Sequence, residues 1–218
     1  MTKGCKILLF AAVAFLSVAP SALADGANLY LAGAGNNVAD GVYVGPYTAQ
    51  INGGPDVPVI CDDYSHESYI GESWNAYVSS MSNMADVRFN PANYDEVAYL
   101  ATILFGLGTD SSTYPEADAI QFAIWSINDP SDVAAAIGSN ACFGSAANDC
   151  VNYWLNQAAN QTWTPGEFSN ILIYTPMTSG NPQEFIVETP EPGAALLLAI
   201  GLLALFVVKR RQSFLPTA

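Results

Sequence analysis

The chain has 218 residues, of which 51% are hydrophobic and 12% charged, with 20 acidic side chains against six basic ones. This balance excludes a nucleic-acid-binding protein, because phosphate backbones are bound mainly by Lys and Arg, and the apolar content excludes an intrinsically disordered chain. The charges are also segregated, since every acid lies between Asp25 and Glu191, where Arg88 is the only base.

The first 24 residues have the three parts of a secretory signal peptide. A basic start precedes an apolar run over residues 7–19 and the small-residue cleavage sequence Ala22-Leu23-Ala24. The apolar run is shorter than the roughly 20 residues that a permanent membrane anchor needs. We therefore expect residues 1–24 to be removed on export, which leaves one secreted domain over residues 25–189.

Within this domain, hydrophobic periodicity and turn residues predict strands, then helices, then strands. The predicted segments are a β-hairpin over 41–64 that turns at Asn52-Gly53-Gly54 and whose second strand ends near Cys61, helices over 91–107, 114–127, 131–137 and 151–159, and strands over 171–174 and 184–188. This order predicts an α+β fold, with a small sheet or barrel and a helical subdomain.

The cysteine count leaves one cysteine over. Cys5 leaves with the signal peptide, and an exported domain enters an oxidising compartment. The residues between Cys142 and Cys150 are small enough to let the two sulfurs meet, so we predict a disulfide between them. Cys61 then has four possible roles: a buried free thiol, half of an intermolecular disulfide, a nucleophile, or half of another covalent bond.

The surroundings of Cys61 and of the second predicted helix favour the last role. Cys61 follows Val59-Ile60 at a predicted strand end, and the helix carries Ile120-Gln121-Phe122-Ala123-Ile124-Trp125. This pair resembles the thioester domains of bacterial surface adhesins, in which such a Cys is joined to the Gln of an apolar-Gln-x-x-apolar-Trp helix. The resemblance implies a Cys61–Gln121 thioester, with Ile120, Ile124 and Trp125 shielding or positioning the bond.

Such a thioester reacts once with its target and is not regenerated. The Cys61 thiolate attacks the carboxamide of Gln121, ammonia leaves, and an amine or hydroxyl of a partner later displaces Cys61. Trp125 lies four residues after Gln121 and therefore on the same helix face, where it can exclude water or simply fill the core. The segment 25–191 contains no lysine to consume the bond or to form a Lys-Asn cross-link. We expect neither turnover nor a cofactor.

His66 is the only histidine, five residues after Cys61. It is either a general base for an incoming nucleophile or for Cys61, or a polar loop residue. A Cys-His hydrolase with Asp63 as orienting acid is the rival interpretation. No helix follows Cys61 to lower its pKa and no peptidase signature surrounds it. Asp62 and Asp63 either raise the thiol pKa or cap a turn.

The domain lacks the residue patterns that other kinds of reactive site require. Zinc sites need more Cys and His than the domain has, and no G-x-S-x-G elbow is present. Asp110, Glu116 and Asp118 could bind calcium, yet no D-x-D-x-D-G loop surrounds them. They are more typical of a solvated loop and a helix start, and we predict no metal site.

The C-terminal end has three parts in a fixed order: Pro190-Glu191-Pro192, the uncharged run 194–208, and Lys209-Arg210-Arg211. This arrangement resembles the PEP-CTERM sorting tail of Gram-negative bacteria. The resemblance implies that residues 190–218 insert transiently into the membrane as a helix and are recognised by an exosortase-type processing enzyme. The cargo then goes to the cell envelope, the outer surface or extracellular polysaccharide. An ordinary single-pass anchor is the alternative.

These interpretations combine into an exported bacterial surface or matrix protein that attaches covalently to amines or hydroxyls of a surface or an extracellular polysaccharide. The alternative from another class is a non-reactive matrix or carbohydrate-binding module in which Cys61 is a buried thiol. The acidic domain disfavours acidic partners in either case.

Overall fold

The computed structural model describes residues 26–189, 200, 201 and 203. The predicted signal peptide lies outside the described residues, and so does almost all of the predicted sorting tail. Within the described part of the chain, none of the helices is both long and apolar enough to cross a bilayer.

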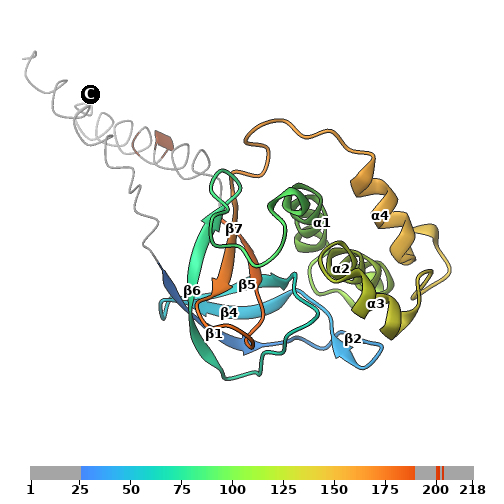
Figure 1. Ribbon diagram of the computed structural model, residues 1–218, viewed down its shortest axis with the longest axis horizontal. Helices are drawn as coiled ribbons and strands as arrows, with labels where there is room; N and C mark the ends of the chain where they lie inside the picture. The colour runs from blue at the N-terminus through green and yellow to red at the C-terminus, as the bar shows by residue number, and fades with distance from the viewer. Residues whose placement is uncertain (1–25, 190–199, 202, 204–218) are drawn as a thin grey trace, which may run out of the picture.

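A closed barrel of six antiparallel strands forms one half of the described domain, in the order β1-β4-β5-β8-β7-β6 (Figure 1). The barrel strands are β1 (Ala27–Gly33), β4 (Tyr47–Ile51), β5 (Asp56–Cys61), β6 (Ser73–Ser80), β7 (Ile171–Pro176) and β8 (Phe185–Glu188). A separate short hairpin joins β2 (Val38–Ala39) to β3 (Val42–Tyr43). The barrel leaves no open sheet edge, because β1 pairs with both β4 and β6.

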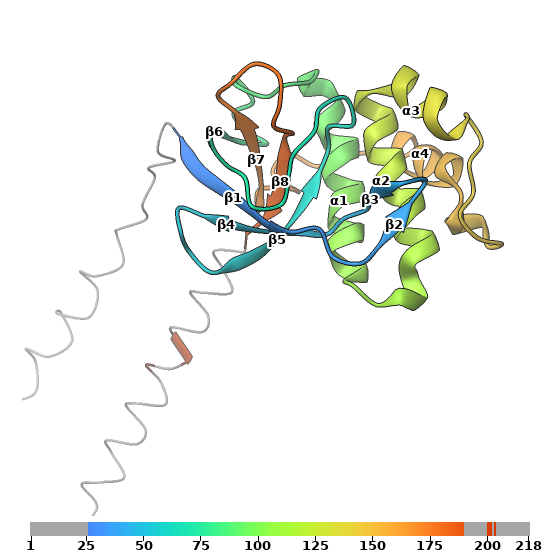
Figure 2. The same ribbon diagram turned by 90° about the horizontal axis from the view of Figure 1, so that it is seen from below.

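The helices lie to one side of the barrel, as Figures 1 and 2 both show. They are α1 (Tyr94–Leu107), α2 (Tyr114–Asn128), α3 (Pro130–Ile137) and α4 (Val151–Ala159), with short 3-10 turns η1 (Pro91–Asn93), η2 (Ser111–Thr113) and η3 (Ala147–Asp149). Helix α2 contacts α1, α3 and α4, while α1 also packs on β5 and β8. This arrangement places α2 in the centre of the helical half, with α1 against the barrel.

The barrel core follows from strand alternation. Leu29, Ala49, Val59, Ile173 and Phe185 are fully buried, each from a different strand. Successive strand residues point to opposite faces, so the residue two places after Val59, at the end of β5, turns to the same side as Val59. The reactive candidate of the sequence analysis is therefore at the inner end of the barrel.

The predicted α+β order is confirmed, and most predicted segments are found within a few residues of their expected bounds. The β4–β5 hairpin turns at Asn52 and Gly53, whose positive φ values of 52° and 69° match the Asn-Gly-Gly signal. Pro115 lies in the first turn of α2 as expected, since proline suits that position.

Three elements were not predicted: β1, the β2–β3 hairpin and β6. Strand β6 alternates buried Trp74 and Ala76 with exposed Ser73 and Asn75, and its Ser and Asn side chains give the segment the composition of a loop. Its partner β7 begins 91 residues after β6 ends, so the pairing is a tertiary contact that local composition does not reveal.

Candidate functional site

Cys61 ends β5, and its side chain is fully buried. It is the only cysteine with a free thiol in the described part of the chain. The thiol donates to the carbonyl oxygen of Asp63 over 3.1 Å, and the N–H of Asp63 points back to Sγ over 3.5 Å. The turn after β5 therefore wraps around the sulfur and holds it.

Gln121 reaches the same point from the middle of α2. Its side chain is fully buried, and its Nε2 donates to the carbonyl oxygen of Cys61 over 2.7 Å. The N–H of Gly45, just before β4, donates to Oε1 of Gln121 over 3.3 Å. The fold thus brings together two residues 60 positions apart, and the carboxamide is held at both its nitrogen and its oxygen.

Gly45 is a site residue that the sequence patterns did not indicate. A Cβ atom at this position would lie 2.9 Å from Oε1 of Gln121, so a larger residue would displace the carboxamide. An N–H donated to a carbonyl oxygen draws electron density from the carbon and stabilises negative charge that develops on the oxygen during attack. The Gly45-Pro46 dipeptide is a local turn signal, but it carries no information about this contact.

The environment of Cys61 disfavours a thiolate. Burial raises the pKa of the thiol well above its usual range, and the acidic side chains of Asp63 and Asp62 raise it further. The backbone of Asp63 and the indole of Trp125 act in the opposite direction. The Trp125 Nε1 makes no hydrogen bond of ordinary geometry, so we assign it an electrostatic effect only. A thioester carries no charge and suits such a buried position better than a thiolate.

Trp125 lies one helical turn after Gln121 and is 2% exposed. Its ring packs against the ring of Tyr64, with centroids 5.2 Å apart. Ile120 and Ile124 are fully buried in the core and hold α2 in place by packing.

A cleft of about 750 Å³ lies beside this centre, and Trp125 forms part of its wall. Its aromatic lining residues are Tyr43, Tyr47, Tyr64, Tyr69 and Trp125. Tyr47 is buried, and its pKa is raised well above its usual range by burial and by the nearby Cys61. Tyr47 therefore adjoins both the cleft and the thiol, a position that the sequence patterns did not indicate.

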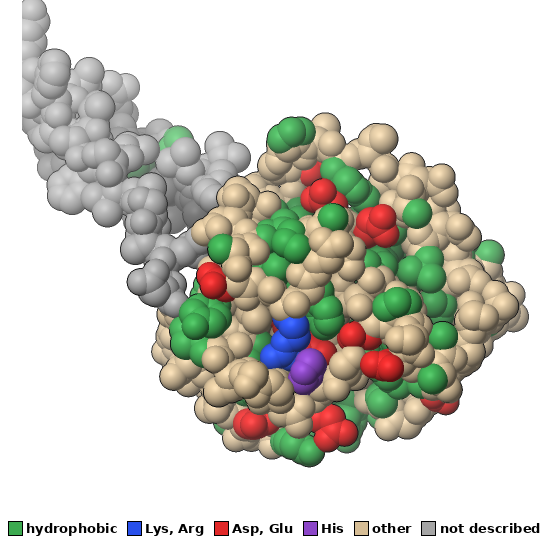
Figure 3. Space-filling view, viewed as in Figure 1, with side chains coloured by type: hydrophobic (Ala, Val, Ile, Leu, Met, Phe, Trp, Pro, Cys, Tyr) green, Lys and Arg blue, Asp and Glu red, His purple; other side chains and the backbone are tan. Residues whose placement is uncertain are grey.

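His66 lines the same cleft. Its Nδ1 lies 2.8 Å from Oδ1 of the buried Asp63 carboxylate, and the guanidinium of Arg88 pairs with Oδ2. Figure 3 shows the arginine and histidine colours side by side on one face. A carboxylate only accepts hydrogen bonds, so Nδ1 of His66 is the ring nitrogen that donates to Asp63, and Nε2 is the one that does not contact it.

The thiol of Cys61 is hydrogen-bonded to the backbone of Asp63 and not to the imidazole of His66. The Asp63–His66 half of the rival Cys-His arrangement is thus present, while the Cys61–His66 hydrogen bond that activates a hydrolase nucleophile is absent from the described contacts.

Asp62 and Glu184 are buried beneath the same turn. Burial and the neighbouring Glu184 hold the pKa of the Asp62 carboxyl well above its usual range, and neither of its oxygens has a hydrogen-bond partner. Glu184 accepts hydrogen bonds from the hydroxyls of Tyr94 and Thr175 and from the N–H of Arg88. The charged form of the Asp62 carboxyl is therefore disfavoured, because water cannot solvate it there.

The three acids considered for calcium do not converge. Asp110 caps η2 by accepting from the N–H of Ser112 over 2.9 Å, and Asp118 accepts from Nδ2 of Asn37 over 2.7 Å. Glu116 lies in the first turn of α2. Among the described residues, no group of three or more Asp, Glu, His or Cys side chains could hold a metal ion.

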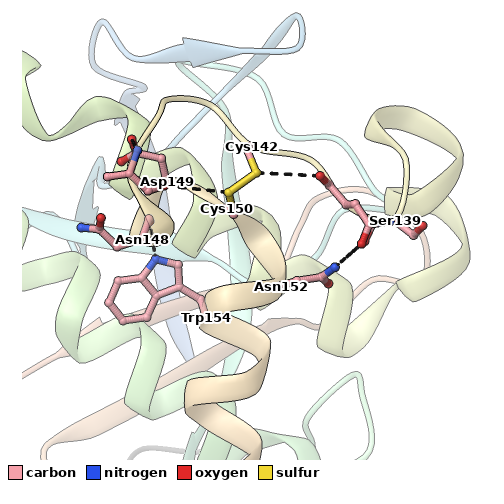
Figure 4. The surroundings of a disulfide bond; sticks show 9 residues. Ser139, Cys142, Asn148, Asp149, Cys150, Asn152 and Trp154 are labelled. Atoms are coloured by element: carbon pink, nitrogen blue, oxygen red, sulfur yellow. Dashed lines mark hydrogen bonds between the residues drawn. A yellow bond between two sulfur atoms is a disulfide. The ribbon is translucent and has the colours of Figure 1, made fainter.

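The predicted disulfide between Cys142 and Cys150 is confirmed (Figure 4). The bond closes the loop around η3, where the indole of Trp154 donates to the carbonyl oxygen of Asn148 over 2.8 Å. The bridge therefore anchors the start of α4 to the loop before it.

The chain is similar to one solved structure, described as the N-terminal thioester domain of surface protein from Clostridium perfringens, at 13% sequence identity and a TM-score of 0.42. The match covers 74% of this chain and 97% of that domain. No protein-family model matches the chain, and no curated protein sequence matches it.

Proposed function

We propose that this chain is an exported bacterial surface or matrix protein in which Cys61 and Gln121 form an internal thioester for covalent attachment. One observation carries the proposal. The Gln121 carboxamide is clamped between the Cys61 carbonyl and the Gly45 N–H, beside a buried free thiol. Any buried glutamine needs hydrogen-bond partners, but here the partners hold the carboxamide at the residue whose thiol is free, which is the arrangement that the thioester requires.

Formation of the bond balances without another reactant. The sulfur of Cys61 bonds to Cδ of Gln121, the bond from Cδ to Nε2 breaks, and the thiol proton leaves with the nitrogen as ammonia. The N–H of Gly45 stabilises the oxygen while the carbon is tetrahedral. The buried position disfavours a charged sulfur, and neither the thiol nor the thioester carries a charge, so the reaction leaves no net charge in the core.

Attachment is a second acyl transfer, in which the acyl group of Gln121 moves from the sulfur of Cys61 to the target. An amine or hydroxyl of the target bonds to the acyl carbon of Gln121, and Cys61 leaves as a thiol. The chain then stays joined to its target, so each copy reacts once. Tyr47 and Trp125 limit the entry of water, which would otherwise hydrolyse the bond.

The proposed location rests on the two ends of the chain and on the disulfide. Residues 1–24 direct export, and residues 190–218 direct sorting by an exosortase-type enzyme after transient membrane insertion. The Cys142–Cys150 bond fits an oxidising compartment.

The test is the intact mass of the purified full chain before and after methylamine treatment. We expect a mass short by one ammonia beyond the disulfide loss, and a methylamine adduct that maps to Gln121. Cys61→Ala and Gln121→Ala should abolish the adduct equally, because each removes one end of the bond. Gln157→Ala on α4 is the matched control and should leave the adduct unchanged.

Two results would contradict the proposal. The full calculated mass with a titratable thiol on Cys61 would favour a passive matrix module. Covalent attachment that survives Gln121→Ala but not Cys61→Ala would favour a plain cysteine nucleophile.

A further inference from the structure

The cleft has features of a binding site in its own right. Tyr47 and Trp125 form part of its wall, and Cys61 and Gln121 are buried and do not line it themselves. It combines aromatic walls with polar side chains at hydrogen-bonding positions: His66, Glu67, Ser68 and Gln183. Its volume of about 750 Å³ falls within the range of roughly 300–1,000 Å³ typical of small-ligand pockets. Tyr43 and Tyr69 are 49% and 61% exposed, so two aromatic faces are open to a ligand.

The polar groups of the cleft are pre-arranged. Tyr69 donates its hydroxyl proton to Glu67 over 2.7 Å, and Gln183 Nε2 donates to the carbonyl oxygen of Asp63 over 2.7 Å. That same carbonyl accepts the Cys61 thiol. In the free-thiol form, the cleft residue Gln183 and the sulfur of Cys61 therefore share one backbone acceptor, which places this part of the cleft wall next to the sulfur.

The charge of the site selects a ligand without negative charge. Arg88 is the only Arg or Lys among the described residues, and its guanidinium is already paired with Asp63. Glu67 adds a carboxylate to the lining. An anionic polymer would find no free cation to compensate it.

We propose that this cleft binds a neutral saccharide and that His66 is the base that directs one of its hydroxyls onto the Gln121 acyl group. This inference rests on the proposed thioester. The apolar C–H faces of sugar rings stack on aromatic side chains, while their hydroxyls bond to groups such as Glu67 and Gln183.

The pairing of His66 with Asp63 favours a hydroxyl over an amine. A neutral amine attacks an acyl carbon without help, whereas a hydroxyl must lose its proton as the new bond forms. Asp63 fixes the imidazole with Nε2 free, and Arg88 keeps Asp63 in place, so Asp63 and Arg88 are positioning residues. An amine target would not need this arrangement.

The step balances as an ester-forming transfer. The sugar oxygen bonds to Cδ of Gln121, and the bond from Cδ to Sγ of Cys61 breaks. The hydroxyl proton passes to Nε2 of His66 and then to the departing sulfur, which becomes a thiol. The product is an ester between the saccharide and residue 121.

The experiment applies the purified full chain to an array of neutral oligosaccharides and to a polylysine surface, both washed with denaturant. We expect retention on neutral glycans that hydroxylamine releases, because hydroxylamine cleaves esters and leaves amides intact. His66→Asn should lower the ratio of ester to methylamine adduct about 100-fold, within the range for loss of a general base. Tyr69→Ala should weaken glycan retention, and Tyr77→Ala, an exposed tyrosine of β6 outside the cleft, should not.

Retention on polylysine with none on any neutral glycan would overturn this inference and leave the thioester proposal intact. An ester-to-adduct ratio unchanged in His66→Asn would also overturn it. Absence of any methylamine adduct would instead remove the proposed function. In that case, the same array washed without denaturant would test whether the cleft binds a saccharide noncovalently. No retention in that wash would overturn a saccharide site.

Discussion

At Gly45 the missing side chain allows a backbone N–H to reach the carboxamide oxygen of Gln121. In the proposed reaction, Gly45 therefore positions the carboxamide although it has no reactive group of its own. At Asp62 the opposite holds, since an ionisable side chain is present but burial disfavours its charged form. A substitution at each of these two residues tests its role.

Gly45→Ala should impair thioester formation. The added Cβ would lie 2.9 Å from Oε1 of Gln121, so the carboxamide must move away from its N–H donor. We expect bond formation to slow by about 10²-fold, the lower end for loss of an oxyanion donor, and stability to fall by about 1–3 kcal/mol through overpacking. The fraction of chain that has lost ammonia and the melting temperature measure both effects.

Gly106→Ala is the matched control, because a Cβ there meets nothing within 4 Å in an exposed part of α1. It should raise stability by about 0.5–1 kcal/mol and leave ammonia loss unchanged. If Gly45→Ala lost ammonia as fast as the unsubstituted chain, the N–H of Gly45 would have no part in the reaction.

Asp62→Asn should stabilise the protein increasingly as the pH rises. The folded pKa of Asp62 is raised, so above the usual aspartate pKa of about 4 the native chain keeps a proton that the unfolded chain has lost. The contribution of Asp62 to the free energy of unfolding is therefore largest at low pH. It falls as the pH rises toward the folded pKa, by at most about 1.4 kcal/mol per pH unit. Asparagine does not titrate, so the free energy of unfolding of Asp62→Asn does not fall with pH in this way.

Melting temperatures from about pH 5 to pH 8 measure the effect. Asp86→Asn, at an exposed acid, is the control and should show no such trend. A difference between Asp62→Asn and the unsubstituted chain that stayed constant with pH would mean that Asp62 is ionised in the folded protein.

At the scale of elements, the position of α2 decides whether Gln121 meets Cys61. The C-terminal end of α2 is tied to the segment after β5, because Asn128 Nδ2 donates to the carbonyl oxygen of Asp62 over 3.0 Å. Immediately after the helix, Asp129 accepts from the N–H of Tyr64 over 2.9 Å. These two contacts set the register between helix and strand end.

Asn128→Ala should therefore loosen this register. The side chain of Asn128 also accepts from Nδ2 of Asn93, so two hydrogen bonds are lost. We expect stability to fall by about 1–3 kcal/mol and ammonia loss to become incomplete. Asn156→Ala on α4 is the control, since its side chain bonds only within its own helix. Complete ammonia loss in Asn128→Ala would indicate that core packing alone positions α2.

At the scale of the whole molecule, the bond would join the barrel half to the helical half. Arg88 lies between Cys61 and Gln121 in sequence and is the only site of tryptic cleavage from residue 25 to residue 191. The disulfide does not bridge this cut, because Cys142 and Cys150 both follow Arg88.

Trypsin should accordingly cut the denatured chain at Arg88 and leave its two fragments joined by the thioester. Treatment with methylamine before digestion should separate them on a denaturing gel without reductant. The Cys61→Ser variant should give separate fragments in either condition. Separate fragments from the untreated chain would show that the bond had not formed.

Local sequence information was sufficient for much of this architecture. Apolar spacing and turn residues located α1, α2 and α4, the β4–β5 hairpin and the last two strands, because each depends on residues close together in the chain. Cysteine counting predicted the Cys142–Cys150 disulfide, whose ends are only eight residues apart.

Other features arose only from the tertiary structure. Closure of the barrel required β1 and β6, which pair with each other across about 40 residues, and β6 also pairs with the distant β7. The Ser and Asn side chains of β6 resemble those of a loop. The contact of Gly45 with Gln121 and the place of Tyr47 beside Cys61 depend on segments that meet only after folding. Residue type and spacing were sufficient to single out Cys61 and Gln121. The N–H donor of Gly45, the aromatic cleft wall and the pairing of His66 with Asp63 are set by long-range packing, which sequence spacing does not reveal.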